Sequence, residues 1–298
     1  MITGITITCF AASYAVALAL EVSRIAFQAK ARNALMRAFA AAGWLAHTLY
    51  LTAHARAELA GGVLIPLSNW HDFCLLAAWV LVGAYLGLSL RRPLFSVGVF
   101  LLPLVLALIG IAWMWRGSPS FPMGEAAGYW RTIHGIALLL GTVGVTLGFA
   151  TGVMHLLQSY RLKHKWPLNP RFRLPSLEWL QRFNREALFL SAGLLAVGLL
   201  AGVILNFGNR SGTGGSVPWN HPVVVSSGIL FLWLLAVVVF EAVYKPAREG
   251  HKIAYLTVAS FVFLGMVLYF VLFSKHGGAD LPAYRPQESG GEVTSHRM

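Results

Sequence analysis

Eight stretches of predominantly apolar residues run through the chain, each separated from the next by a more polar segment. They cover residues 2–23, 38–56, 72–90, 94–115, 132–158, 187–206, 222–244 and 253–274. A helix needs about 20 such residues to cross the hydrocarbon core of a bilayer. We therefore expect an all-α, polytopic membrane protein with about eight transmembrane helices, which form one integral membrane domain over residues 1–276. The polar stretch 277–298, which contains Gly and Pro, is expected to be a disordered outer tail.

The amino-acid composition agrees with burial in lipid. Of the 298 residues 57% are hydrophobic and only 11% are charged, against about 25% charged residues in soluble domains, and the mean hydropathy is +0.66. These values exclude a soluble enzyme, a disordered chain and a disulfide scaffold. Cys9 and Cys74 both lie in apolar stretches without a CxxC spacing, which is typical of packing residues.

The distribution of basic residues indicates how the helices cross the membrane. With the N-terminus outside, the inner loops carry 16 Lys and Arg residues and the outer segments carry 7, which is the asymmetry that the positive-inside rule describes. We predict an N-out, C-out protein that crosses the membrane several times. Topology accounts for the net charge of +12, so no nucleic-acid partner is expected. The chain has no Walker A, HExxH or GxSxG motif.

Polar residues within or beside the apolar stretches each have two interpretations. Ser176 is expected to cap a short helix, which either rests on the inner leaflet or joins two spans. Asp72 either caps the third apolar stretch or orients the neighbouring His71. Glu241 either reaches the inner interface or acts within the membrane. His47, near the midplane, either binds a ligand or makes a hydrogen bond to a neighbouring helix.

Histidines supply the candidate chemistry. Five of the ten lie at the outer ends of the predicted helices, where a bundle can bring them together: His54, His71, His134, His221 and His276. Imidazole is a common ligand of haem iron and also binds zinc and copper. Because few carboxylates lie on the outer side, the pattern argues against a carboxylate metal cage. The aromatic residues near these histidines either wall a porphyrin or form the aromatic belt of the membrane interface.

Five segments carry short motifs whose order matches a known family. The segments are Gly43–Leu49, Pro66–Trp79 with its initial Pro-Leu-Ser-Asn, Tyr129–His134, Trp219–Pro222, and His276 after the last apolar stretch. This order resembles that of the cytochrome c assembly family, which comprises CcsA-, ResC- and CcmC-type membrane haem handlers and HemX-like members. The resemblance covers most of residues 40–280, and the eight apolar stretches fit the family's eight-span members.

The resemblance implies a membrane haem-handling protein that supports cytochrome c maturation. It makes His134 and His276 the expected axial ligands of a haem b held at the outer face for attachment to apocytochrome c. The other residues expected to contact the cofactor are Trp219, His221, His47 and Trp130. The implied partners are apocytochrome c and a second assembly subunit in the bilayer that has a large outer domain. The resemblance leaves open whether the chain is the membrane component of a haem lyase.

Two departures from the family pattern leave other functions open. The family's Trp-rich outer segment is Gly-rich here and retains only Trp219, and Glu241 stands where haem-synthase members have an intramembrane histidine. A HemX-like regulator of tetrapyrrole biosynthesis, without catalytic activity, is therefore the first alternative. A polytopic transporter is the second, because the glycines of the fifth and sixth stretches allow either motion or close helix packing.

Overall fold

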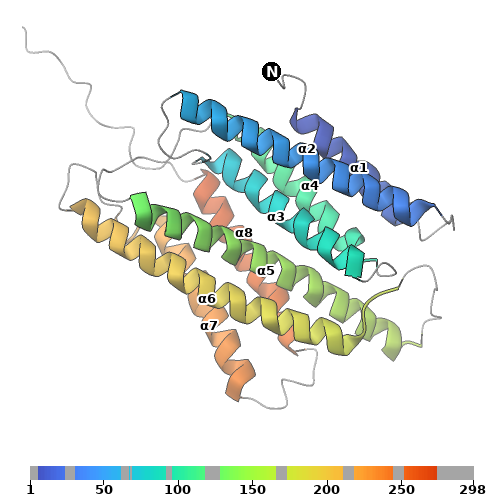
Figure 1. Ribbon diagram of the computed structural model, residues 1–298. Helices are drawn as coiled ribbons and strands as arrows, with labels where there is room; N and C mark the ends of the chain where they lie inside the picture. Colours follow the sequence, from blue (N-terminus) through green and yellow to red (C-terminus); the bar gives the residue numbers. More distant parts are fainter. Residues whose placement is uncertain are drawn as a thin grey trace, which may run out of the picture.

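The computed structural model describes residues 6–23, 31–61, 67, 69–91, 96–117, 128–165, 173–210, 218–243 and 252–273. Within these residues the chain is all-α (Figure 1). The helices are α1 (Ile7–Ser23), α2 (Arg32–Ala60), α3 (Trp70–Arg91), α4 (Gly98–Met114), α5 (Gly128–Lys163), α6 (Leu177–Arg210), α7 (Pro222–Val243) and α8 (Lys252–Phe273). The eight described helices correspond in order to the eight apolar stretches of the sequence.

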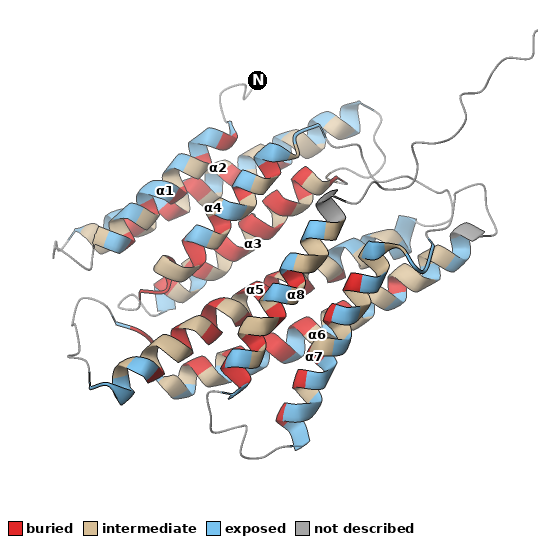
Figure 2. Ribbon diagram, turned by 180° about the vertical axis from the view of Figure 1, so that it is seen from behind, coloured by how far each residue is buried: buried red, intermediate tan, exposed pale blue. Residues whose placement is uncertain are grey.

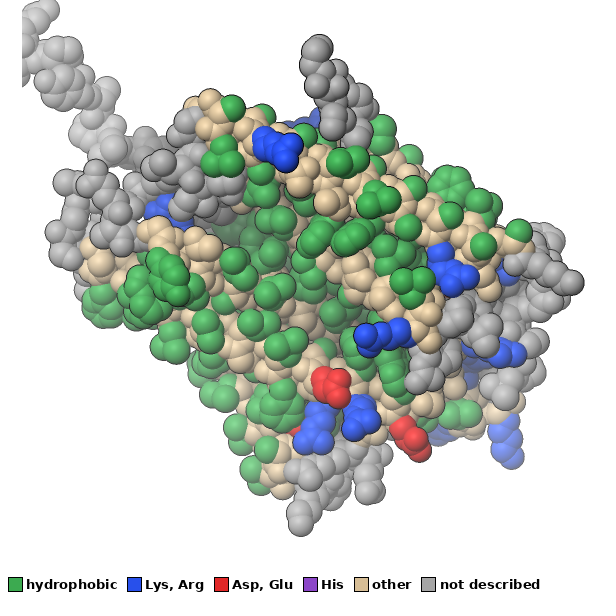
Figure 3. Space-filling view, viewed as in Figure 1, with side chains coloured by type: hydrophobic (Ala, Val, Ile, Leu, Met, Phe, Trp, Pro, Cys, Tyr) green, Lys and Arg blue, Asp and Glu red, His purple; other side chains and the backbone are tan. Residues whose placement is uncertain are grey.

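Five of the described helices, α3 and α5 to α8, are long and apolar enough to cross a membrane. α1 and α4 are apolar but have 17 residues each, and α2 is longer but less apolar. Large apolar side chains, among them Leu190, Leu200 and Val262, are exposed, and hydrophobic residues cover much of the face in Figure 3. An exposed apolar surface of this kind is matched to lipid. The chain is therefore a multi-pass membrane protein.

The helices form two groups that meet along α5. In the first group α1 packs against α2 and α4, and α3 packs against α2 and α4. In the second group α5 packs against α6 and α8, and α7 packs against α6 and α8. α3 and α4 contact α5 and so join the groups (Figure 1). Buried residues accordingly lie along α3 and α5 (Figure 2).

α5 and α6 are antiparallel and lie unusually close because small residues line their contact. A Cβ atom on Gly144 would lie 2.9 Å from the Cβ atom of Ser191, and one on Gly198 would lie 2.8 Å from Cδ2 of Leu138. Real Cβ atoms do not approach other atoms so closely, so a side chain at Gly144 would collide with Ser191, and one at Gly198 would force Leu138 to move. Small residues at helix contacts are typical of membrane bundles. The structure thus supports the packing interpretation of these glycines.

α6 begins well before its apolar stretch. The Oγ atom of Ser176 accepts a hydrogen bond from the backbone amide of Trp179 at 3.3 Å, which confirms the predicted helix cap. The helix that starts there continues without a break to Arg210. The expected short helix is therefore the first part of α6 and leads directly into its apolar stretch.

Candidate functional site: histidines at one end of the bundle

Four of the predicted outer histidines lie at one end of the bundle, which we call the histidine end: His54 near the end of α2, His71 at the start of α3, His134 near the start of α5 and His221 just before α7. The loops and helix ends around them also carry exposed aromatic side chains, among them Trp130 and Trp219. The fifth histidine, His276, lies outside the described residues.

His134 is held in one orientation by the neighbouring helix. Its Nδ1 atom lies 2.6 Å from the carbonyl oxygen of Gly198 on α6, and a carbonyl can only accept, so Nδ1 carries the proton. The neutral ring therefore keeps a free lone pair on Nε2. A Cβ atom on Gly202 would lie 2.8 Å from Cε1 of His134, so the absence of a side chain at Gly202 makes room for the ring. This is the arrangement in which histidine binds a metal, with the second nitrogen fixed by a backbone carbonyl.

His221 has the opposite proton arrangement. The backbone amide of Val223 donates to Nδ1 of His221 at 3.3 Å, so this nitrogen is an acceptor and the neutral ring carries its proton on Nε2. α5 and α7 share no contact within the described residues, although both pack against α6 and α8. The structure therefore brings His134 and His221 to the same end of the bundle.

The two tryptophans of the predicted cofactor set are accessible. Trp130 packs edge-on against Tyr129 on the first turn of α5, and Trp219 lies 5.8 Å from the ring of Phe207 at the end of α6. Their side chains keep 40% and 42% of their surface exposed. Either an apolar ligand or the headgroup region of the membrane can cover such surfaces.

His47 lies apart from the histidine end, inside the first helix group. Its ring is fully buried, stacks on Phe10 of α1 at 4.1 Å and has Nδ1 3.3 Å from the hydroxyl of Tyr14. α2 and α5 share no contact within the described residues, so His47 and His134 lie on helices that do not pack against each other. The hydrogen bond to a neighbouring helix is the interaction that the sequence offered as the alternative to ligand binding.

Glu241, the acid expected to reach the inner interface, is 1% exposed on α7. Its Oε1 atom lies 2.9 Å from Nε of Arg185 on α6. The carboxylate of Glu241 is therefore paired with a basic side chain near the end of α7 and is not itself exposed. Arg185 itself stays half exposed, as expected of a long basic side chain whose head remains in contact with the polar region.

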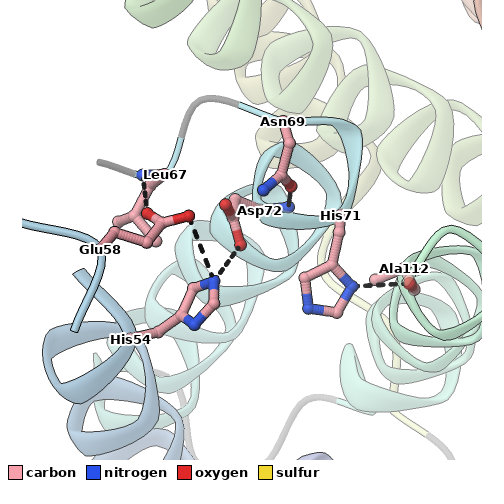
Figure 4. A network of polar contacts seen from close by, with 7 residues as sticks. All are labelled: His54, Glu58, Leu67, Asn69, His71, Asp72 and Ala112. Atoms are coloured by element: carbon pink, nitrogen blue, oxygen red, sulfur yellow. Dashed lines mark hydrogen bonds and ion pairs between the residues drawn. The ribbon is translucent and has the colours of Figure 1, made fainter. Parts of the chain in front are cut away.

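One cluster at the histidine end was missed by the sequence analysis. His54 and Glu58 on α2 converge with Asp72 on α3, and their ligand atoms all lie within 4.8 Å of one another (Figure 4). A cavity of about 330 Å³ adjoins this cluster, and His54, Glu58, His71 and Arg116 are among the residues that line it. The spacing of His54 and Glu58 by four residues puts both on one helix face and was the available signal. The antiparallel packing of α2 and α3 that adds Asp72 was not visible in the sequence.

The start of α3 also corrects the assignment of its cap. The backbone amide of Asp72 donates to Oδ1 of Asn69 at 2.8 Å, so Asn69 is the capping residue and the carboxylate of Asp72 is left for other contacts. Asp72 does not orient His71 either, since Nδ1 of His71 lies 2.7 Å from the carbonyl oxygen of Ala112 on α4. Like His134, His71 therefore carries its proton on Nδ1.

Comparison with models of protein families identifies the family. A family model described as cytochrome C assembly protein matches residues 67–277, which include α3 to α8. No curated protein and no solved structure matches the chain. The matched range begins within the Pro-Leu-Ser-Asn segment and ends just after His276.

Proposed function

The chain belongs to the cytochrome c assembly protein family, and from this premise we propose that it holds haem b at the outer face of a bacterial inner membrane for attachment to apocytochrome c. In this proposal His134 and His276 bind the haem iron, while Trp130, Trp219 and His221 surround the porphyrin. The eight helices all cross the membrane, with both termini outside. The observation that carries the proposal is the orientation of His134 by Gly198, which leaves Nε2 as a ligand atom at the histidine end.

The chain's own residues supply binding and orientation. The hydrogen bond to the carbonyl of Gly198 fixes the ring plane and proton position of His134 and raises the basicity of Nε2. The close contact between α5 and α6, with glycine at position 202, makes the position of that ring rigid. Bound haem would supply vinyl groups to which the thiols of a CxxCH motif add, so the protein contributes position and access rather than acid–base chemistry. A membrane subunit with a large outer domain would present the apocytochrome.

An absorption spectrum tests the proposed ligands. The reduced, purified protein is expected to show low-spin haem, since two imidazoles produce a strong ligand field. His134→Ala and His276→Ala should each lose the low-spin signal and regain it when free imidazole is added. His155→Ala is the matched control, because position 155 is 21 residues further along α5, about 31 Å away at 1.5 Å per residue. Wild-type spectra from both alanine variants would contradict the assignment.

A gene deletion separates this function from the regulatory alternative, which the Gly-rich outer segment favours. Loss of holocytochrome c with intact b-type haem proteins supports the assembly role. Unchanged cytochrome c together with altered glutamyl-tRNA reductase abundance supports a HemX-like regulator of tetrapyrrole biosynthesis. If neither changes, a transport function becomes the better explanation.

A further inference from the structure

Three side chains of the histidine end form a cluster that the proposed haem ligands do not include. We propose that His54, Glu58 and Asp72 bind a divalent transition-metal ion, zinc in particular, which ties the end of α2 to the start of α3 (Figure 4). The site would supply one imidazole nitrogen and two carboxylate oxygens, with a fourth position open toward the adjoining cavity. The inference is independent of the haem proposal, since it uses none of the same residues.

The distances within the cluster fit metal ligands better than direct hydrogen bonds. Nε2 of His54 lies 3.4 Å from Oδ1 of Asp72 and 3.6 Å from Oε1 of Glu58. A charge-assisted hydrogen bond between imidazole and carboxylate is about 2.7–2.9 Å long. Ligand atoms that lie about 2.0–2.2 Å from a tetrahedral zinc ion are about 3.3–3.6 Å from each other. Both separations from Nε2 of His54 fall in this range, and all three ligand atoms lie within 4.8 Å of one another. One imidazole nitrogen, with a single proton, cannot donate well to both acids.

Asp72 provides the strongest sign that something else belongs between these groups. Its side chain is completely buried, and apart from the 3.4 Å contact with His54 no polar group of the described residues reaches its carboxylate oxygens. A buried carboxylate with only one long polar contact carries a desolvation cost of several kcal/mol, and such groups are normally closely paired or bound to a metal. In Figure 4 the carboxylate of Asp72 points toward His54 and Glu58, into the centre of the cluster.

The two carboxylates of the cluster favour the binding of a cation. Glu58 and Asp72 together carry two negative charges, and within the described part of the chain neither forms an ion pair with Lys or Arg. Arg116 lines the adjoining cavity but comes within ion-pairing distance of neither acid among the described contacts. A divalent ion would neutralise both carboxylates while a neutral His54 donates its lone pair.

Neighbouring groups hold the proposed ligands in place. The second oxygen of Glu58, Oε2, accepts a hydrogen bond of 2.7 Å from the backbone amide of Leu67, which leaves Oε1 for the cluster. The ring of His54 stacks nearly parallel on Tyr50, one turn earlier on α2, with 6.0 Å between ring centroids. Outer contacts of this kind orient ligands in metal sites. Leu67 has a φ of 58°, a left-handed conformation that is rare for leucine. Its backbone is therefore strained in the conformation that places its amide against Glu58.

The ligand atoms of His54, Glu58 and Asp72 suit some metals better than others. Zinc accepts imidazole nitrogen and carboxylate oxygen, and three protein ligands with an open fourth position are the pattern of zinc sites that hold a water or a substrate. Calcium prefers six to eight oxygen ligands, and magnesium prefers octahedral oxygen coordination, which the three side chains do not provide. The absence of a thiolate argues against copper(I). Arg116 at the cavity wall would favour an anion or a water in the open position.

Zinc binding to the purified full-length protein tests the inference. The protein is prepared in detergent without a histidine tag, stripped with a chelator and titrated with Zn²⁺ against a chromogenic competitor. We expect one zinc per chain, a rise in melting temperature on zinc addition, and tetrahedral ligand-field bands when Co²⁺ replaces zinc. Excess Mg²⁺ or Ca²⁺ should not displace the ion.

Ligand variants decide whether zinc binds at this cluster. His54→Gln, Glu58→Gln and Asp72→Asn should each weaken zinc binding by at least about tenfold. The matched controls His164→Gln and Glu178→Gln change exposed residues just after the end of α5 and at the start of α6, and both variants should bind zinc like the wild type. Asp72 is buried, so Asp72→Asn can fail to fold. In that case His54→Gln, at a partly exposed position, tests the inference instead. The inference would be overturned if the wild type bound no zinc, or if His54→Gln and Glu58→Gln bound zinc as tightly as the wild type. His134→Ala should keep zinc, so a failure of the haem proposal is recognised separately.

Discussion

The Nε atom of Arg185 on α6 lies 2.9 Å from the Oε1 atom of Glu241 on α7. The acid is almost completely buried, whereas the guanidinium is half exposed. An isolated carboxylate in the hydrocarbon region is costly, so the arginine explains how α7 can carry an acid among apolar residues. The contact also links α6 to α7 at the end opposite the histidines.

Removal of this arginine should destabilise the bundle. Arg185→Ala leaves a buried carboxylate without its guanidinium partner, and we expect a loss of about 1.5–3 kcal/mol, visible as a lower melting temperature in detergent. Glu241→Gln should cost less, because Arg185 can remain solvated. The control is Arg182→Ala, since the pair of Arg182 with Glu186 is 3.7 Å apart and exposed on both sides and should contribute about 0–1 kcal/mol. Equal effects of Arg185→Ala and Arg182→Ala would contradict a role for burial.

The close approach of α6 to His134 makes Gly202 sensitive to substitution. Gly202→Ala places a Cβ atom 2.8 Å from Cε1 of His134, so the ring must move and its hydrogen bond to Gly198 must weaken. We expect a loss of about 1–3 kcal/mol from overpacking and a reduced low-spin haem signal. Gly193→Ala is the matched control on the same helix, because its Cβ atom would meet nothing within 4 Å. That variant should keep the spectrum and gain up to about 1 kcal/mol from helix propensity.

The contacts of His47 predict a structural role. His47→Phe should preserve the stacking on Phe10 and leave both the haem spectrum and cytochrome c maturation unchanged. Tyr14→Phe removes the hydroxyl that contacts Nδ1 of His47 and should cost about 0.5–1.5 kcal/mol in thermal or denaturant unfolding. Loss of the low-spin haem signal in His47→Phe, with a normal melting temperature, would assign the residue to the cofactor instead.

The charge asymmetry predicts the orientation of the helices. A reporter fused after Lys165 should be cytoplasmic, and one fused after Ala283 should lie outside the membrane. These positions flank the last three helices, so an odd number of crossings separates them. The same location for both reporters would contradict the eight-span topology and the outer position of the histidine end.

The sequence by itself determined the helices and their order, because the signal for a membrane span is local. Eight apolar stretches predicted eight helices, and each described helix overlaps one stretch. The cap at Ser176 was also predictable, since a cap depends on a hydroxyl and an amide three residues apart. The family resemblance rested on short motifs in a fixed order, and the matched range of 67–277 confirms it.

Only the tertiary structure decided which polar groups meet. Asp72 is 14 residues beyond Glu58, and Glu241 is 56 residues beyond Arg185, so each pair depends on how two helices pack and rotate. The apolar faces that set this packing are broad, because lipid-facing and buried positions are both hydrophobic. A membrane helix therefore shows little amphipathic pattern from which its inward side could be read. For that reason the sequence located the histidine end, whereas the packing of α2 on α3 and of α5 on α6 determined what its side chains contact.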